Sequence, residues 1–528
     1  MLSGLSVFSQ EDAWVYFNAK PDSQAYIDNP LTMLTQRSLD RRAIQNIALD
    51  IKDVPVHQSY IDQISAANGI AVMAKSKWFN ALHIRGAQVD IDALLTLSFV
   101  DHVEYANHSL NSGNRMAAPT QSKKINKFLD TDVVFNYGNS LNQIQMLNGV
   151  QLHQQDFTGA GKVIAVMDGG FPGVNTASTF ARLRDNNQIM GGYDYVNRNA
   201  NFYTGISHGT MVLSTMGGYK NNQLVGTAPD ASYYLFITED GDNESPLELS
   251  LWVEAAEEAD RVGADIINTS LGYTQFDNPS YNFTYEDMNG QTSFASRGVE
   301  VAFSRGMICV VSAGNDGNAD WHYIASPADA VSALTIGAVN AAGNIASFSS
   351  YGPSFDGRIK PDVAAQGQQA VLSNTTGSIT TASGTSFSGP IMAGMVASFW
   401  QALPNKTNVE IVQLIKESAS IYTTPNDRIG YGIPDFGQAL ADALGTANFT
   451  STKFTVYPNP FQERITIAFP AGFGKADVTL YNAIGQAVLE QKVSTDNPAI
   501  LLHTLNSGVY LYKIQSDTFS QSGKLVKE

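Results

Sequence analysis

The middle of the chain alternates short apolar runs with segments of helical spacing. Residues 163–167 and 307–311 are continuously apolar, which is typical of parallel strands covered on both faces. Between them, apolar residues from Leu249 towards Gly263 recur at the spacing of an amphipathic helix. This alternation predicts an α/β domain with a doubly wound, mostly parallel sheet over residues 137–446.

The regions on either side have other patterns. Residues 10–105 predict a small α+β domain, and residues 106–136 a polar, exposed linker. From residue 447 to residue 528, alternating segments separated by turns predict a β-sandwich. The predicted strands are 14–17, 69–74, 81–84 and 101–105 in the first domain and 464–469, 476–481, 487–492 and 509–514 in the last, and the first domain has predicted helices at 30–47 and 90–97.

Composition narrows the class of protein. A chain of 528 residues exceeds what one core holds, which supports several domains. A formal net charge of −17 disfavours nucleic acid and anionic membranes as partners, and no apolar run is long enough to span a membrane. The one cysteine, Cys309, is expected to be a buried structural thiol. Residues 1–9 resemble the remnant of a secretory signal peptide, with an ordinary flexible N-terminus as the alternative.

Candidate chemistry begins at Ser386. The serine precedes a helix of small and apolar residues, which is typical of a helix buried in a large domain. The N-terminus of a helix offers unpaired N–H groups and a partial positive charge, and both favour an oxyanion beside the hydroxyl. The alternative is a buried helix in which the serine is only the N-cap and has no catalytic role.

Two other polar residues occupy positions where function is common. Asp168 follows the apolar run 163–167, at the carboxyl end of a predicted strand, where open α/β sheets place functional groups. His208 begins a second segment of small residues. Taken singly, Asp168 can be a turn former and His208 a polar cap. Together with Ser386 they follow the chain order of one convergent Ser-His-Asp arrangement, that of the subtilisins.

These motifs resemble those of the subtilisin-like (subtilase) serine peptidases over residues 137–445. The matching segments are Tyr137-Gly138, Gln143-Ile144, the strand ending at Asp168, His208-Gly209-Thr210, Gly226 to Ala231, Ile267 to Gly272, Ser312 to Asn315 and Gly384 to Ser386. Several motifs in register over three hundred residues make the resemblance specific. Gly169 departs from the Ser or Thr that is common there, which removes only a hydroxyl.

The resemblance implies a serine endopeptidase with a catalytic triad of Asp168, His208 and Ser386. It also implies that the Asn315 amide and the Ser386 N–H donate to the oxyanion. The substrate-binding residues that it implies are Ser270, Leu271, Gly272, Ser312 and Gly314. The substrates would be proteins or peptides. The segment 273–292 is interpreted as an insertion beside these substrate-binding residues. It is expected to be a solvated loop, and a role in substrate specificity is the alternative.

The flanking regions add further expectations. The position of residues 10–105 ahead of a subtilase domain implies a propeptide that assists folding and inhibits the enzyme until it is cut away within 106–136. Residues 447–528 resemble the C-terminal sorting domain of type IX secretion cargo, on Tyr457-Pro458-Asn459-Pro460, Gly508-Val509-Tyr510 and the closing Lys524 to Lys527. A permanent accessory domain and a generic β module are the respective alternatives.

The sequence therefore predicts a secreted or cell-surface serine endopeptidase, made as a zymogen and acting as a monomer. A subtilase-fold adhesion or binding protein with incidental hydrolysis is the alternative. No cofactor is expected. Structural calcium is usual in relatives, but no constellation of ligands in the sequence assigns a metal site.

Overall fold

The chain forms two compact units, one ending at Leu440 and the other spanning Ala441–Glu528. The structure is a computed structural model that describes residues 10–111, 135–444, 454–469, 474–482, 485–495, 497–516 and 520–528. The predicted signal-peptide remnant at 1–9 and most of the predicted linker at 106–136 lie outside these residues. The two units are described separately below.

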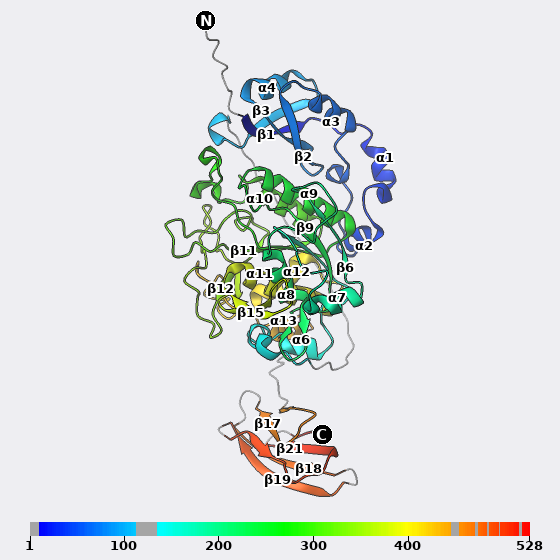
Figure 1. The fold of residues 1–528 in the computed structure, drawn as a ribbon, viewed down its shortest axis with the longest axis vertical. Helices are drawn as coiled ribbons and strands as arrows, with labels where there is room; N and C mark the ends of the chain where they lie inside the picture. Colours follow the sequence, from blue (N-terminus) through cyan, green and yellow to red (C-terminus); the bar gives the residue numbers. More distant parts are fainter. Residues whose placement is uncertain are drawn as a thin grey trace. The chain divides into compact units, whose positions relative to one another are not determined.

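A seven-stranded sheet in which all paired strands are parallel forms the centre of the larger unit (Figure 1). Its order is β13-β12-β11-β10-β5-β9-β6. The strands are β5 (Val163–Asp168), β6 (Ile189–Asp194), β9 (Ser232–Ile237), β10 (Ile266–Thr269), β11 (Ile308–Ser312), β12 (Leu334–Val339) and β13 (Val363–Gln366). The predicted doubly wound parallel sheet is confirmed, and Cys309 lies fully buried in β11.

Helices cover both faces of this sheet. The helices α9 (Leu247–Val262) and α10 (Phe294–Ser304) share a core with Ala165, Met167 and Ile267. Residues alternate between the faces of a strand, so Ile164 and Val166 point to the opposite face, where α8 (His208–Gly217) and α11 (Thr385–Ala402) pack together. The remaining helices of this region are α5 (Leu141–Gln145), α6 (Val150–Gln154), α7 (Ala181–Asp185), α12 (Asn408–Glu417) and α13 (Phe436–Ala443).

An antiparallel sheet of order β2-β3-β1-β4 forms the N-terminal domain. Its strands are β1 (Gln10–Phe17), β2 (Ile70–Ser76), β3 (Ala81–Ala87) and β4 (Val100–Tyr105), and its helices are α1 (Ser23–Asp28), α2 (Gln36–Ile44), α3 (Gln58–Ser65) and α4 (Gln88–Ala93). The predicted helix 30–47 is too long, because Thr35 is extended and caps a shorter α2. The helix α3 was not predicted.

The N-terminal sheet packs on α9 and α10 (Figure 1). The Trp14 ring stacks on Phe294 at 5.0 Å between centroids, and its Nε1 donates to Ser250 Oγ at 2.7 Å. The carboxylate of Glu257 on α9 accepts hydrogen bonds from Ser76 Oγ at 2.6 Å and from the N–H of Trp78 at 2.9 Å. Burial of apolar surface is combined here with directed polar contacts.

The segment 273–292 is not a solvated loop, and that expectation was wrong. It contains the 3₁₀ turns η7 (Pro279–Tyr281) and η8 (Tyr285–Asp287). Its aromatic side chains lie in the same core as Trp14, and the Tyr281 hydroxyl accepts a hydrogen bond from the N–H of Asp12 at 3.2 Å. The buried side chains are Tyr273, Phe276, Tyr281, Phe283 and Met288. Contacts with segments distant in sequence, among them the N-terminal strand at Asp12 and the catalytic domain at Glu239, account for this order.

The smaller unit contains two antiparallel sheets, of orders β16-β17-β20 and β19-β18-β21-β22. The strands are β16 (Thr455–Tyr457), β17 (Arg464–Ala468), β18 (Lys475–Tyr481), β19 (Ala487–Ser494), β20 (Ala499–Leu501), β21 (Gly508–Gln515) and β22 (Ser520–Lys527). Apolar residues from both sheets, including Ile465, Val478 and Leu525, form one core, so this unit has the predicted sandwich architecture.

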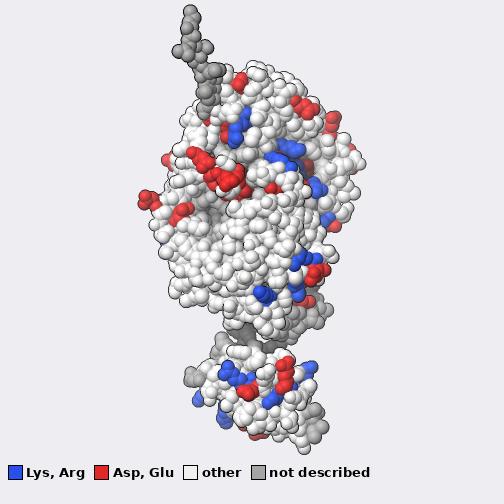
Figure 2. Space-filling view, in the orientation of Figure 1, with Lys and Arg blue, Asp and Glu red and all other residues white. Residues whose placement is uncertain are grey.

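Charged side chains are sparse on the face of the larger unit that Figure 2 shows. Figure 2 shows wide uncharged areas and no broad basic area on the face in view, in keeping with 15% charged residues and a net charge of −17. None of the helices in the described ranges is long and apolar enough to cross a membrane.

Substitution of Gly394 tests how closely α11 is packed against its neighbours. A Cβ added there would lie 2.0 Å from Thr227 Oγ1 and 3.2 Å from the N–H nitrogen of Ala228. Helix propensity alone favours alanine by about 1 kcal/mol. We expect Gly394→Ala instead to lower the free energy of unfolding by about 1–3 kcal/mol, because the overpacking outweighs the propensity. Thermal unfolding of the full chain measures this.

Gly437→Ala in α13 is the matched control, because an added Cβ there meets only the ends of the Gln151 and Asn148 side chains. A Gly394→Ala protein as stable as the Gly437→Ala protein would contradict the expected close packing.

Candidate active site

Asp168 and His208 are brought together by the end of β5 and the start of α8. His208 Nδ1 lies 2.9 Å from Asp168 Oδ1 and 3.0 Å from Oδ2. A Cβ on Gly209 would lie 2.9 Å from Asp168 Cβ and 2.5 Å from the carbonyl oxygen of Gly170, so glycine permits this close approach of α8 to the strand end. Asp168 is fully buried, whereas 27% of the His208 side chain is exposed.

The pair has clear electrostatic consequences. The Asp168 carboxylate raises the pKa of His208 above its ordinary value of 6.5, while burial of the ring lowers it and Glu239 adds a smaller upward effect. The N–H of Gly169 also donates to Asp168 Oδ1 at 2.8 Å, which supports the charged carboxylate. With Nδ1 directed at Asp168, Nε2 is the nitrogen left to exchange a proton with another group.

Ser386 is the second residue of α11, two positions after the N-cap Gly384. Proline has no N–H, so Pro390 cannot donate to the carbonyl oxygen of Ser386 four residues earlier. Ser270 Oγ donates to that oxygen instead, at 3.1 Å, and Ser386 Oγ donates in return to the carbonyl oxygen of Ser270 at 3.3 Å. This reciprocal pair fixes the start of α11 against the residue that follows β10.

Ser386 and His208 share no hydrogen bond within the described residues, but the first turn of α11 reaches the His208 ring. The ring of Phe387, the next residue, lies 5.9 Å from the His208 ring. Ser386 Oγ is directed at Ser270 O instead. A hydrogen bond between a serine nucleophile and a histidine base is often long without substrate and shortens when substrate binds.

Asn315 lies beside the start of α11. Its Oδ1 accepts hydrogen bonds from the N–H of Thr385 at 2.8 Å and from Thr385 Oγ1 at 3.1 Å. The donors of Nδ2 are thereby left for another acceptor, and the Asn315 side chain is exposed. Thr385 Oγ1 also donates to the carbonyl oxygen of Gly314 at 3.1 Å, which ties this loop to the helix.

Two segments that follow neighbouring strands flank Ser386. Ser270, Leu271 and Gly272 come after β10, and Ser312 ends β11 and is followed by Ala313 and Gly314. Ser312 Oγ donates to the carbonyl oxygen of Thr385 at 2.8 Å. The structure thus brings all five predicted substrate-binding residues to the same end of the sheet as Asp168.

Ala325 was not predicted to belong to this region. A Cβ on Gly272 would lie 3.0 Å from Ala325 Cβ, and one on Gly314 3.9 Å from it, so Ala325 lies between the two segments. Gly314 has φ +108°, where a side chain is strained, and an added Cβ would also lie 2.9 Å from Ser350 Oγ. No motif marks Ala325 in the sequence.

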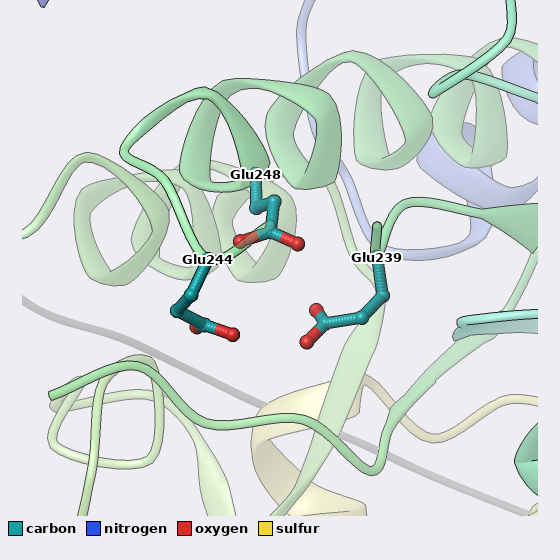
Figure 3. A group of neighbouring side chains, drawn as sticks. All are labelled: Glu239, Glu244 and Glu248. Atoms are coloured by element: carbon teal, nitrogen blue, oxygen red, sulfur yellow. The ribbon is translucent and has the colours of Figure 1, made fainter. Parts of the chain in front are cut away.

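Three glutamates form a second polar group near His208, which no motif in the sequence marks. The carboxylates of Glu239, Glu244 and Glu248 converge on one point, with oxygens within 4.8 Å of one another (Figure 3). Burial raises the pKa of Glu239 to about 8 and that of Glu248 to about 9, and the charges of neighbouring carboxylates add to both effects. Burial and Asp277 raise the pKa of Glu244 to about 7.

The donor set of this group does not fit calcium. Calcium takes six to eight oxygen ligands, often including carbonyl oxygens. Here both oxygens of Glu248 accept backbone N–H groups, from Asp240 at 2.8 Å and Ser245 at 3.0 Å, and Glu239 accepts the Tyr273 hydroxyl at 3.1 Å.

The raised pKa of Glu244 predicts a loss of stability at alkaline pH. Its folded pKa of about 7 exceeds its ordinary value of 4.5. The unfolded chain therefore releases this proton first, and stability falls as the pH rises from 4.5 through about 7. Because Glu244 is partly exposed, we expect Glu244→Gln to raise the free energy of unfolding by about 1–2 kcal/mol at pH 9 and to leave it unchanged at pH 4.

Thermal unfolding at the two pH values measures this effect, in a Ser386→Ala background that prevents self-digestion. Glu286→Gln, at an exposed glutamate, is the control. An equal gain in the free energy of unfolding at pH 9 in both variants would contradict the assignment of this effect to Glu244.

Comparison with curated proteins shows similarity to bacterial subtilisins and an alkaline protease. The chain is 29% identical over 275 residues to subtilisin BL of Lederbergia lenta, which covers 52% of this chain and 89% of that protein. It is 28% identical over 297 residues to the thermostable alkaline protease of Halalkalibacterium halodurans, which covers 56% of this chain and 72% of that protein. It is 29% identical over 280 residues to subtilisin E of Bacillus subtilis, which covers 52% of this chain and 65% of that protein.

Among solved structures, the crystal structure of MycP1 with its N-terminal propeptide removed aligns with a TM-score of 0.44 and 23% identity. The alignment covers 57% of this chain and 96% of that one.

Three family profiles match successive parts of the chain. The Bacteroidota peptidase S8 propeptide domain matches residues 12–125, the subtilase family residues 159–432, and the secretion system C-terminal sorting domain residues 455–528. The last of these marks the protein for secretion or attachment to the cell surface. With more than half of its length matched by the subtilase profile, the chain belongs to the subtilase family of serine endopeptidases and carries a propeptide domain and a secretion sorting domain.

Proposed function

We propose that Asp168, His208 and Ser386 form the catalytic triad of this peptidase, with Asn315 in the oxyanion hole. The observation that carries the proposal is the pairing of a fully buried Asp168 with a partly exposed His208, at 2.9 Å, beside a serine at a helix N-terminus. The raised pKa of His208 suits a group that accepts a proton and then donates it.

The reaction proceeds through an acyl-enzyme. Ser386 Oγ attacks the scissile carbonyl carbon while His208 Nε2 takes its proton. The oxyanion accepts hydrogen bonds from Asn315 Nδ2 and the N–H of Ser386. His208 then donates its proton to the leaving amine as the peptide bond breaks, and a water molecule repeats the sequence to release the acid. Asp168 stays ionised and holds the imidazole in the required tautomer.

Substrates are proteins or peptides, bound in extended form along residues 270–272, with the residue before the cut between that segment and residues 312–314. The small side chain of Ala325 forms the base of this pocket. The geometry that supports this is its position between Gly272 and Gly314.

The enzyme is made as a zymogen. Residues 10–105 form the inhibitory propeptide, residues 106–136 contain the maturation site, residues 137–446 form the catalytic domain, and residues 447–528 engage the type IX secretion machinery. The mature enzyme acts as a monomer. Mass spectrometry of the secreted protein identifies both processed termini.

Substitution of Ser386 tests the assignment of the nucleophile. We expect Ser386→Ala to abolish cleavage of casein, and phenylmethylsulfonyl fluoride to label Ser386 alone in the unmodified enzyme. Cleavage by Ser386→Ala at the unmodified rate would refute the triad. Complete labelling without turnover of any protein or peptide would favour the binding-protein alternative.

Asn315→Ala tests the oxyanion donor. We expect kcat to fall about 10²–10³-fold with KM little changed, the range known for removal of one such donor in a subtilisin. The exposed Asn318 lies in the same loop, and Asn318→Ala should leave kcat unchanged. Equal effects of the two substitutions on kcat would show that Asn315 has no special part in stabilising the transition state.

Ala325→Val tests the base of the pocket. We expect kcat/KM to fall at least about tenfold for peptide anilides with an aromatic residue before the cut, and less than about threefold for those with alanine there. Ala319→Val, at an exposed position, is the control. A uniform loss over both substrates would place Ala325 outside the pocket.

A further inference from the structure

The order of the central strands determines what lies on each side of a bound substrate. Because the strands follow one another as β11-β10-β5-β9, residues 312–314 lie on one side of residues 270–272, and the ends of β5 and β9 lie on the other. In the proposed substrate position, the residue before the cut lies between 270–272 and 312–314. Successive side chains of an extended chain point to opposite sides. The second residue before the cut therefore points towards the ends of β5 and β9.

An exposed apolar side chain and a carboxylate lie at these two strand ends. Ile206, two residues before His208, is 44% exposed, and its N–H donates to the carbonyl oxygen of Gly169 at 3.0 Å. Glu239 comes two residues after β9. A Cβ added to Gly169 would lie 2.6 Å from Ile206 Cδ1 and 3.5 Å from Glu239 Cβ. The glycine after Asp168 thus leaves room for both side chains next to His208.

The Glu239 carboxylate is fixed in place but keeps a free acceptor. Tyr273, which directly follows residues 270–272, donates its hydroxyl to Glu239 Oε2 at 3.1 Å. Within the described residues, Glu239 Oε1 and the Glu244 carboxylate accept no hydrogen bond. Figure 3 shows these two carboxylates directed at one another, and their oxygens lie within 4.8 Å. Glu248, the third member, is different, because both of its oxygens already accept backbone N–H groups.

This group of carboxylates has no cationic partner of its own. Within the described residues, none of the three glutamates forms an ion pair with a lysine or arginine, and the charges that act on them are mostly those of other carboxylates. Elsewhere in the chain buried carboxylates are paired: Asp260 binds two arginines and Asp362 two lysines. Negative charge that is withdrawn from water without a partner is costly. A cationic side chain from a ligand would supply the missing partner.

We propose that Ile206 and Glu239 select substrates with a lysine or arginine as the second residue before the cut. The apolar stem of that side chain lies on Ile206, and its charged end is bound by Glu239 and Glu244. The inference rests on the proposed function, because it uses the proposed course of the substrate along residues 270–272. It adds the chemical class of one substrate residue to that function.

The preference should increase with pH. Burial, with the charge of Glu244 as the next cause, raises the pKa of Glu239 to about 8, and burial with a neighbouring carboxylate raises that of Glu244 to about 7. At pH 6 both groups are therefore mostly neutral, and at pH 9 both are mostly ionised. The ionisable groups that share this environment are Glu244, Tyr273, Asp168, His208 and, on α9, Glu248.

The test compares two peptide anilides with phenylalanine before the cut and either lysine or leucine one position earlier. We expect the mature enzyme at pH 9 to cleave the lysine peptide with a kcat/KM at least about tenfold higher, and at pH 6 less than about threefold higher. Glu239→Gln keeps the shape of the side chain and removes its charge. It should lower the ratio at pH 9 to less than about threefold.

Asp242→Asn is the matched control, because it removes one negative charge from an exposed position of the same loop. It should leave the ratio of the two kcat/KM values unchanged at both pH values. Circular dichroism verifies that each variant is folded. If Glu239→Gln does not fold, Glu244→Gln decides the question, and it should lower the ratio at pH 9 at least about threefold.

Equal cleavage of the two peptides by the unmodified enzyme at pH 9 would overturn the proposal. A lysine preference of the same size at pH 6 and pH 9, or one that persists in Glu239→Gln and Glu244→Gln, would do the same. A wrong assignment of the triad is seen separately, as cleavage that is retained by Ser386→Ala, because the ratio of the two peptides does not depend on which residue is the nucleophile.

Discussion

The parallel pairing of β5, β10 and β11 is the constraint on which the rest of the site depends. Met167 lies opposite Thr269, and Thr269 opposite Val311, so the next residues in each strand, Asp168, Ser270 and Ser312, reach the same edge together. A slip of one residue would turn each side chain to the other face of the sheet. Buried apolar side chains on both faces prevent such a slip. The position of the reacting groups is thus a consequence of core packing.

Two groups of carboxylates close to His208 illustrate opposite electrostatic solutions. Asp168 is fully buried, yet His208 and the N–H of Gly169 stabilise its charge. The three glutamates 239, 244 and 248 lie near one another, and burial raises the pKa of each, with a further upward effect of a neighbouring carboxylate in each case. Burial alone therefore does not decide the charge of a carboxyl group here. The nearest charges also matter, because Asp168 faces an imidazole whereas Glu239 and Glu248 face other carboxylates.

Much of the catalytic domain could be predicted from local patterns. A continuous apolar run indicates β5, and Asp168 follows it directly. Small residues around Ser386 indicate that α11 is buried. The pairing partners of the buried arginines could not be predicted, because Arg41 and Arg42 read as the exposed face of a helix until Asp260, more than two hundred residues later, is placed against them. The burial of the aromatic residues in 273–292 and the position of Ala325 could not be predicted for the same reason, because segments distant in sequence pack against them.

Cys309 gives the central sheet an internal reporter. It is the only thiol of the chain and lies fully buried in β11, three residues before Ser312. Its side chain lies in the core that α9 and α10 share with the sheet, so a thiol reagent reaches it only when this covering layer opens, and the rate of its modification measures how often that happens. The strand that ends at Ser312 therefore carries a natural probe of local opening, without any added label.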